Sequence, residues 1–445
     1  MNRMNRSPNR SFARPSLDRF RVMALFLGML IGLAGSLPAQ EEGGRYQGFS
    51  TRVTGDIYGQ VKVIRDVDGD GKRDMVFGAT DGMVHIYSAS GKEIQAGLWP
   101  KHTGGPILAN VAVADLTRDG KDEIIVGSYD GKVYCLNSYG KELWTVDTRG
   151  TIQLSGPEVA DIDGTNNLNV FVGSRSGKVF RIDDAGKLLW EIGLPAKVSA
   201  RVVPADLNGD GQKEIVVKDD GGKVSVLQLG GGTATGWPQG TAAGLDWPFE
   251  VGITDVNGDG EREIFTTTPD KRFILWDRHG NEKETFKLSD GAHSAPKVAD
   301  IDGDGRDEFI ITQADGIVNV VNRQGVALPG WPQKTGHSIY APPHIIDIDG
   351  DGKLDVVFTA WNPEGSGKEA GYIMALTKDG KKMSGFPKMI GKTLAPLTFA
   401  DLDGDGYLEM IAAGGINYTD NQLHVFPTNA KIQMKIAVLG SEITY

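Results

Sequence analysis

Eight acidic loops of nine residues recur along the chain, and they constrain its fold more than any other feature. The first is "DVDGDGKRD", Asp66 to Asp74, with carboxylates at positions 1, 3, 5 and 9. Loops 2 to 8 begin at Asp115, Asp161, Asp206, Asp255, Asp300, Asp347 and Asp401. Successive loops start 49, 46, 45, 49, 45, 47 and 54 residues apart, a period typical of one supersecondary unit per repeat. The sequence therefore predicts a repeat protein.

Each repeat reads as four short strands. An apolar run such as "ILANVAVADL" leads into the loop, "EIIVGS" leaves it, and a two-residue turn such as "DG" precedes "KVYCLN" and "GKELW". No part of the chain after the N-terminal segment shows a sustained helical period. Residues 59–440 are therefore predicted to form an all-β domain, a β-propeller of eight four-stranded blades. Seven blades with an extra hairpin is the alternative, and an open solenoid would want polar capping repeats that are not visible.

The closure of the ring is less clearly specified. The last repeat offers four strands of its own, "TLAPLTFADL", "EMIAAGG", "QLHVFP" and "KIQMKIAVLG", before a tail at 441–445. Within the N-terminal segment 40–58, "YQGFSTRV" at residues 46–53 is a candidate extra outer strand for the last blade.

The chain begins with the layout of a signal peptide. Six arginines precede the fourteen-residue apolar run "VMALFLGMLIGLAG", which is followed by "SLPAQ". We expect cleavage near Ala39, so that residues 1–39 are removed and the mature protein is secreted or periplasmic. An uncleaved anchor is the alternative, although the run is short for a membrane span. No second long apolar stretch follows, so no membrane span is expected after cleavage.

Charge and cysteine content narrow the function classes. The formal charge of −11 becomes −16 without residues 1–39, which contain six arginines and one aspartate. Nucleic acid is therefore an unfavourable partner. Of the 58 acidic residues, 27 occupy positions 1, 3, 5 and 9 of the loops, which points to cation sites. Cys135 is the one cysteine, so an intrachain disulfide is excluded.

Calcium explains the acidic loops best. It takes six to eight oxygen ligands at about 2.3 to 2.6 Å, and closely spaced Asp side chains around a Gly-rich turn supply them. Position 7 varies freely, which suggests that its backbone carbonyl is the ligand. Magnesium is the weaker candidate because it keeps its waters. The predicted metal ligands are Asp66, Asp68, Asp70, Asp74, Asp115, Thr117, Asp119, Glu123, Asp206, Asn208, Asp210, Glu214, Asp255, Asn257, Asp259, Glu263, Asp300, Asp302, Asp304, Glu308, Asp347, Asp349, Asp351, Asp355, Asp401, Asp403, Asp405 and Glu409.

The eight loops are not equivalent. Loop 3, "DIDGTNNLN", has Thr165 at position 5 and Asn169 at position 9, so only Asp161 and Asp163 are charged. We expect this site to be weak or empty. Loop 2 has Thr at position 3 but keeps three acids. The chain should thus hold about seven calcium ions, with an eighth degenerate site.

These motifs resemble those of FG-GAP or VCBS repeat proteins. The resemblance rests on the "DxDxDGxxD/E" loop between two strands, on the repeat period, and on the "GLWP", "GWP" and "GFP" stretches, and it covers residues 45–440. It is similar to the propeller of integrin α subunits, which implies calcium in loops between the first and second strands. "DGKVYCLNSYGKELW" also resembles a PQQ-type propeller repeat. A secreted bacterial protein of this type is expected.

No catalytic motif stands out. The sequence has no G-x-S-x-G and no H-E-x-x-H motif. We therefore predict a non-catalytic module for adhesion, binding or scaffolding, with a glycan or protein partner. The alternative is a polysaccharide lyase resembling the eight-bladed rhamnogalacturonan lyases. Candidate ligand contacts on the face opposite the loops are Trp247, Tyr340 and Trp361, the last at the start of the long segment "WNPEGSGKEAG".

Overall fold

The computed structural model describes residues 46–243, 250–362, 370–415 and 421–432. The expected signal peptide, Trp247 and the tail at 441–445 lie outside these residues. No helix in the described part of the chain has the length and apolar character needed to cross a membrane.

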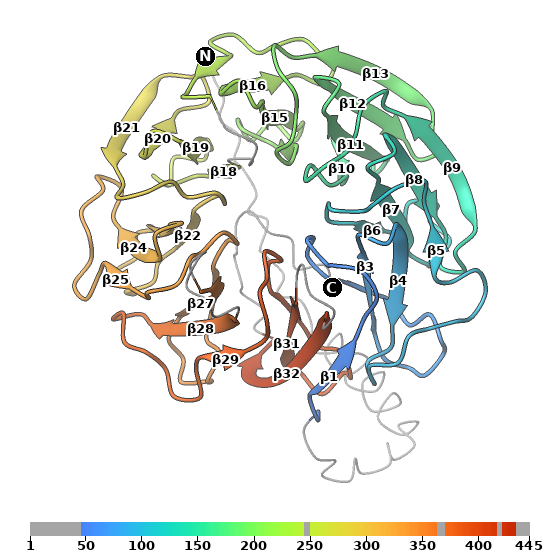
Figure 1. The fold of residues 1–445 in the computed structure, drawn as a ribbon. Coiled ribbons are helices and arrows are strands. Elements are labelled where there is room, and N and C mark those ends of the chain that lie inside the picture. Colours follow the sequence, from blue (N-terminus) through green and yellow to red (C-terminus); the bar gives the residue numbers. More distant parts are fainter. Residues whose placement is uncertain (1–45, 244–249, 363–369, 416–420, 433–445) are drawn as a thin grey trace, which may run out of the picture. The chain divides into compact units, whose positions relative to one another are not determined.

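The described residues form eight antiparallel sheets of four strands, arranged in a ring (Figure 1). The prediction of an eight-bladed propeller is confirmed. The innermost strands are β2 (Lys62–Ile64), β6 (Ala112–Ala114), β10 (Glu158–Asp161), β14 (Val203–Ala205), β18 (Val251–Thr254), β22 (Lys297–Ala299), β26 (His344–Ile346) and β30 (Thr398–Ala400). Each begins one of blades 1 to 8.

The second strand of each blade follows an acidic loop. These strands are β3 (Asp74–Gly78), β7 (Glu123–Gly127), β11 (Leu168–Ser174), β15 (Glu214–Lys218), β19 (Glu263–Thr267), β23 (Glu308–Thr312), β27 (Asp355–Trp361) and β31 (Tyr407–Gly414). The third strands are β4 (Met83–Tyr87), β8 (Lys132–Leu136), β12 (Lys178–Asp183), β16 (Lys223–Leu227), β20 (Arg272–Trp276), β24 (Ile317–Val321), β28 (Gly371–Thr377) and β32 (Gln422–Lys431).

The outermost strands are shorter or more exposed. They are β5 (Lys101–His102), β9 (Glu142–Asp147), β13 (Leu188–Gly193), β17 (Gln239–Gly240), β21 (Glu282–Lys287), β25 (Gln333–Lys334), β29 (Lys388–Met389) and, in blade 8, β1 (Phe49–Arg52). Short outer strands leave little unpaired sheet edge at the rim of the ring.

The ring is closed by the N-terminal strand. β1 pairs antiparallel with β32, with Phe49 opposite Val425 and Arg52 opposite Gln422. Blade 8 therefore takes its fourth strand from the other end of the chain (Figure 1). The expectation that the last repeat supplies all four of its strands is wrong for this blade. Its C-terminal part provides three, and most of "KIQMKIAVLG" lies outside the described residues.

The hydrophobic core is divided among the contacts between neighbouring blades. Between blades 1 and 2, for example, Val76 and Ile86 pack with Ile124 and Leu136. The central strands of each blade are rich in β-branched and aromatic residues that suit this packing between two sheets. Seven further clusters of buried residues join the remaining pairs of neighbouring blades. The fold therefore positions each acidic loop on a rigid base.

Tryptophans also tie neighbouring blades together. Trp237, from a "GWP" stretch in blade 4, donates a hydrogen bond from Nε1 to the carbonyl of Arg278 in blade 5, at 2.9 Å. Trp99, Trp144, Trp190 and Trp331 make the same kind of bond to the turn between the third and fourth strands of the next blade. The resemblance noted these stretches but not their role, which is to join blades.

Candidate metal sites

The eight acidic loops lie on one face of the propeller, because each joins the innermost strand of a blade to its second strand. In loop 1 the position-1 residue, Asp66, organises the backbone. Its Oδ1 accepts hydrogen bonds from the amides of Gly69 and Asp70 at 2.6 and 3.2 Å, and its Oδ2 accepts one from Gly71 at 2.7 Å. The position-1 aspartates of the other seven loops accept the same bond from the position-6 amide. The first carboxylate therefore fixes the curl of every loop.

Positions 4 and 6 need a left-handed backbone. Gly69 and Gly71 have φ values of +84° and +85°, and a Cβ at either would meet nothing within 4 Å. Glycine is thus required by conformation and not by space. The two exceptions keep the same conformation, since φ is 60° at Arg118 in loop 2 and 64° at Asn166 in loop 3.

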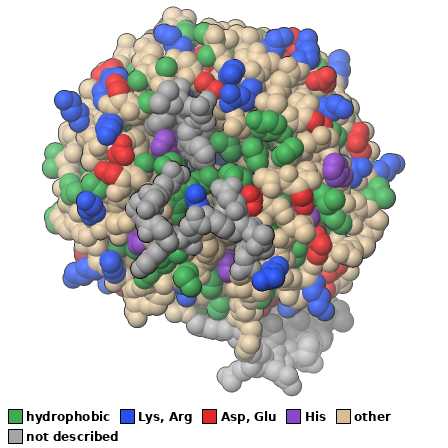
Figure 2. Space-filling view, in the orientation of Figure 1, with side chains coloured by type: hydrophobic (Ala, Val, Ile, Leu, Met, Phe, Trp, Pro, Cys, Tyr) green, Lys and Arg blue, Asp and Glu red, His purple; other side chains and the backbone are tan. Residues whose placement is uncertain are grey.

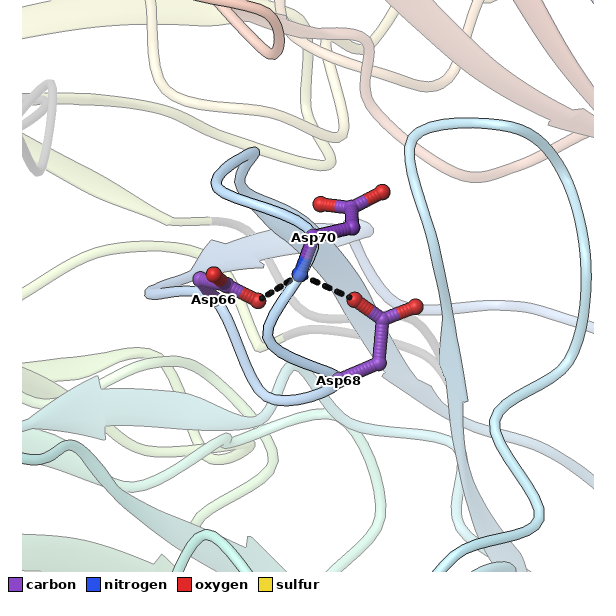
Figure 3. A group of neighbouring side chains, drawn as sticks. All are labelled: Asp66, Asp68 and Asp70. Carbon is purple, nitrogen blue, oxygen red and sulfur yellow. Dashed lines mark hydrogen bonds between the residues drawn. The ribbon is translucent and has the colours of Figure 1, made fainter.

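Positions 1, 3 and 5 gather carboxylate oxygens. Figure 3 shows Asp66, Asp68 and Asp70 around the amide of Asp70, which donates to Asp68 Oδ1 at 3.1 Å as well as to Asp66. In loops 1, 6 and 7, one oxygen from each of these three positions lies within 4.8 Å of the others. In loop 8 the equivalent group is Asp401, Asp403 and Glu409. These oxygen-only clusters match the ligand chemistry of hard divalent cations.

The position-9 residue closes each site from the side of the sheet. Asp74 is 0% exposed, and its Oδ2 accepts the amide of Val67 at 2.7 Å. Its Oδ1 is buried and has no hydrogen-bond partner among the described residues. The position-9 carboxylates of loops 4 to 8 accept the position-2 amide in the same way. A buried carboxylate oxygen without a partner is costly, so the residues present fit a bound cation.

The raised pKa values of the position-9 carboxyl groups also fit a bound cation. Burial, together with repulsion from Asp68, Asp66 and Asp70, raises the pKa of Asp74 to about 7. The same two causes raise the pKa of the other position-9 acids, to about 7 for Glu308 and Asp355, to about 8 for Glu409, and in direction for Glu123, Glu214 and Glu263. Without a cation, these carboxyl groups resist ionisation. A divalent ion supplies the positive charge that reverses this.

Loops 4 and 5, which have an amide at position 3, share the bond to the oxygen of that amide but differ in the residue to which its Nδ2 donates. In loop 5, Asn257 Nδ2 donates to Glu263 Oε1 at 2.9 Å, while Asn257 Oδ1 accepts the amide of Asp259 at 2.8 Å. In loop 4, Asn208 Oδ1 accepts the amide of Asp210 at 2.9 Å. The structure thus brings three predicted ligands together in loops 1, 6, 7 and 8 and links pairs of them in loops 4 and 5, and their role as ligands stays a prediction.

Loop 3 departs from this pattern. Asp161 Oδ2 keeps the shared bond to the position-6 amide, that of Asn166, at 2.8 Å, but Asp163 Oδ1 accepts the hydroxyl of Thr165 at 2.5 Å. The groups of three acids within the described residues that could hold a metal lie in loops 1, 6, 7 and 8, and so do not include loop 3 or loops 2, 4 and 5. The poor charge content of loop 3 agrees with the expectation of a weak or empty site, which stays a prediction.

Hydrogen bonds between loops were not anticipated from the sequence. The amide of Arg73 in loop 1 donates to the carbonyl of Leu402 in loop 8 at 2.9 Å. The amides of Lys213 and Arg262 donate to the position-2 carbonyls of the preceding loops at 2.8 and 2.9 Å. Arg65 Nη1 also donates to the carbonyl of Gly120 in loop 2 at 2.7 Å. The candidate sites are therefore linked around the face.

The opposite face carries the aromatic residues considered as ligand contacts. Tyr340 precedes β26 and Trp361 ends β27, so both lie at the end of blade 7 away from the loops. Their ring centroids are 5.0 Å apart, and Lys392 Nζ lies 4.5 Å from the centroid of the Trp361 ring. Trp361 is only 6% exposed, so most of its ring packs within the protein. Tyr340 is half-buried and stacks on His293 at 4.8 Å.

Comparisons with known proteins agree with the fold. A model of the lambda-carrageenase β-propeller domain matches residues 75–155, and a model of the FG-GAP-like repeat matches residues 206–266, 255–311 and 347–412. No curated protein sequence matches the chain.

Two solved structures have a similar fold. The biofilm matrix protein Bap1 from V. cholerae has a TM-score of 0.64 and 13% identity, over 87% of this chain and 91% of that chain. BamB from Moraxella catarrhalis has a TM-score of 0.56 and 16% identity, over 86% of this chain and 99% of that chain. At such identities the likeness shows the fold alone. Taken with the eight four-stranded sheets, the repeat matches identify the chain as an eight-bladed β-propeller protein with FG-GAP-like repeats.

Proposed function

We propose that the protein is an exported, calcium-stabilised propeller that binds a glycan or protein partner without catalysis. The observation that carries the calcium assignment is the buried Oδ1 of Asp74, which has no hydrogen-bond partner among the described residues and stands beside three further carboxylates. Calcium is favoured over magnesium because each loop offers several carboxylate and carbonyl oxygens, whereas magnesium keeps most of its water ligands. Export follows from the N-terminal sequence pattern.

The role of calcium in this proposal is structural. The sites are spread over the ring, and their loops are hydrogen-bonded to one another. Extracellular modules bind calcium with Kd values of about 10⁻⁴ to 10⁻³ M, so millimolar calcium contributes roughly 0.4 to 1.4 kcal/mol per site. Calcium ions at all these sites together stabilise the ring, and no single site supplies most of that stability.

Two observations support partner binding. The matched propeller model is named for a lambda-carrageenase, and a similar structure is a biofilm matrix protein. One face of the molecule carries Lys, Arg, Asp and Glu side chains of both signs around its periphery, with hydrophobic side chains between them (Figure 2). Of the two aromatic candidates that the structure describes, Tyr340 is more accessible than Trp361.

The second candidate function is polysaccharide cleavage, which the carrageenase name favours. An assay that offers sulfated galactans and pectic polysaccharides to the full chain in calcium would separate the two. Binding seen by affinity electrophoresis, with no new reducing ends and no ultraviolet-absorbing unsaturated product, is the expected result. Release of such products, lost when the protein is boiled, would replace the binding proposal by the enzymatic one.

A further inference from the structure

Arg181 interrupts a position that is apolar in every other blade. It lies in β12 opposite Phe171 of β11, two residues beyond Asn169, the position-9 residue of loop 3. In the other blades this register holds a buried residue without charge: Ile86, Cys135, Val226, Leu275, Val320, Ala375 and Val425. Loop 3 is also the one loop whose position 9 is not an acid. The added cation and the missing carboxylate therefore occur in the same blade.

The contacts of Arg181 lead into loop 3. Its Nε donates to Oδ1 of Asn169 at 2.5 Å, and Asn169 is 4% exposed. Its Nη1 donates to the carbonyl of Leu229 in blade 4 at 3.0 Å. Its charge also acts on the carboxylate of Asp163, the position-3 residue. The guanidinium thus contacts the closing residue and interacts with a second residue of the loop.

A second arginine reaches the same loop from the other side. Arg118 stands at position 4 of loop 2, where the other seven loops have glycine, and its φ of 60° is an unfavourable, left-handed backbone for a residue with a side chain. Its Nη2 donates to the carbonyl of Asn166 and, at 2.7 Å, to Oδ1 of Asn167, both in loop 3. The guanidinium of Arg118 in loop 2 thus contacts the neighbouring loop 3.

We propose that loop 3 is a site filled by the protein itself, in which the guanidinium groups of Arg181 and Arg118 take the place of a calcium ion. The loop has two carboxylates, Asp161 and Asp163, where the fullest loops have four, and the positive charge of Arg181 acts on Asp163. A guanidinium is weakly hydrated and has several fixed donors, so it suits a half-buried position lined by amide and carbonyl oxygens. The inference rests on the proposed calcium sites. It implies that blades 2 and 3 are held together without a calcium ion at loop 3.

Hydrogen exchange on the full chain tests this directly. Loop 6 is the matched comparison, because it keeps all four acids and has Val320 in the register of Arg181. When calcium at about 1 mM is replaced by EDTA, loop 6 amides should exchange roughly two- to elevenfold faster. Residues 161–169 should exchange at an unchanged rate. An equal response in the two loops would overturn the inference.

Conversion of loop 3 tests the role of Arg181. The variant Thr165→Asp, Asn166→Gly, Asn169→Glu, Arg181→Val reproduces the pattern of the other blades and should bind one more calcium ion per chain than the wild type. The same loop changes with Arg181 retained should not gain that ion. Equal gains in the two variants would show that the guanidinium does not occupy the site, and the proposal would fall.

A third variant separates this inference from the calcium proposal. Arg181→Val alone should lower the unfolding midpoint by the same amount in calcium and in EDTA, because the resident charge is lost in both. If the wild type binds no calcium at any loop but this loss is seen, the calcium proposal fails and the assignment of Arg181 stands. If Arg181→Val costs no stability in either buffer, the assignment itself is wrong.

Discussion

At the scale of single residues, the closing carboxylate at position 9 carries most of the electrostatic argument. Glu409 is 1% exposed, and burial and nearby aspartates raise its pKa to about 8. A glutamate in an unfolded chain has a pKa of about 4.3. Between these two values the folded, metal-free protein holds a proton that the unfolded chain has released. The free energy of unfolding must therefore fall as pH rises across this window.

We predict different pH dependences with and without calcium. In EDTA, stability should fall between about pH 5 and 8, whereas in millimolar calcium it should fall less, because the ion binds the same carboxylates once they have lost their protons and so offsets part of the loss. Buried Lys218, whose pKa burial lowers to about 7, adds a rising slope to both curves, so the difference between the buffers isolates the loops. Denaturant titrations at fixed pH measure this. Parallel curves in the two buffers would contradict it, and Glu409→Gln should reduce the difference.

A second residue-scale prediction ranks two loops. Asp302→Ala removes a charged ligand from loop 6, which has all four acids, while Asp163→Ala acts on loop 3, where arginines supply the charge. The first variant should lose roughly 0.4 to 1.4 kcal/mol of calcium-dependent stability. The second should lose little that depends on calcium. Melting each variant in calcium and in EDTA gives the two differences, and a larger calcium-dependent loss for Asp163→Ala would refute the ranking.

Two arginines that the structure places at loop 3 could be seen in the sequence only as departures from the repeat pattern. Arg181 in "KVFRID" and Arg118 in place of glycine both break the repeat pattern. That each of them contacts loop 3 depends on how neighbouring blades pack, which the sequence does not show. Trp361 shows the reverse case. Its position before Asn362 and Pro363 suggested a ligand contact, yet it is buried beside Tyr340 and Lys392. A sequence pattern gives the type of residue at a position and not its neighbours across the fold.

At the scale of elements, periodicity predicted the four strands of a repeat well, because buried strands between turns leave a strong local pattern. For the last blade it predicted one strand too many from the C-terminal repeat, whereas the candidate outer strand within residues 46–53 is confirmed as β1, paired with β32. β1 reads "FSTR", with burial that only alternates between partial and none, so its local pattern alone does not specify this partner. The tight contact of β1 with blade 1 was not predicted, since it depends on Gly91.

Gly91 offers a test of closure. Its φ is +79°, and a Cβ there would lie 2.7 Å from two ring carbons of Phe49 on β1. Gly91→Ala should therefore lower stability by about 2–4 kcal/mol, from backbone strain and from crowding of the closing strand. Gly385→Ala is the matched control, because φ is +81° and nothing lies within 4 Å. This control variant should lose only the stability that backbone strain costs. Equal losses in the two variants would mean that the contact of Gly91 with Phe49 does not matter for ring closure.

At the scale of the whole molecule, the candidate sites act together because the ring is closed. Eight clusters of buried residues join the blades, and the acidic loops add hydrogen bonds between blades on one face. Opening one blade contact in a closed ring breaks the ring as a whole. Calcium bound at separate loops is therefore expected to raise one common thermal transition, whereas the local fluctuations that hydrogen exchange reports stay specific to each loop.

The last prediction follows from this coupling. Raising calcium from chelated levels to the millimolar range should shift a single melting transition upward, with contributions of roughly 0.4 to 1.4 kcal/mol from each of the seven acid-rich loops. The sum is several kcal/mol, which exceeds what one site of this affinity supplies. Differential scanning calorimetry across a calcium series, with magnesium at equal concentration as the control, measures the shift and the number of transitions. Magnesium should have a much smaller effect, because the loops offer an all-protein cage that it seldom accepts. Identical melting curves in EDTA and in millimolar calcium would show that the acidic loops are stable turns without a metal, held by the position-1 hydrogen bonds alone.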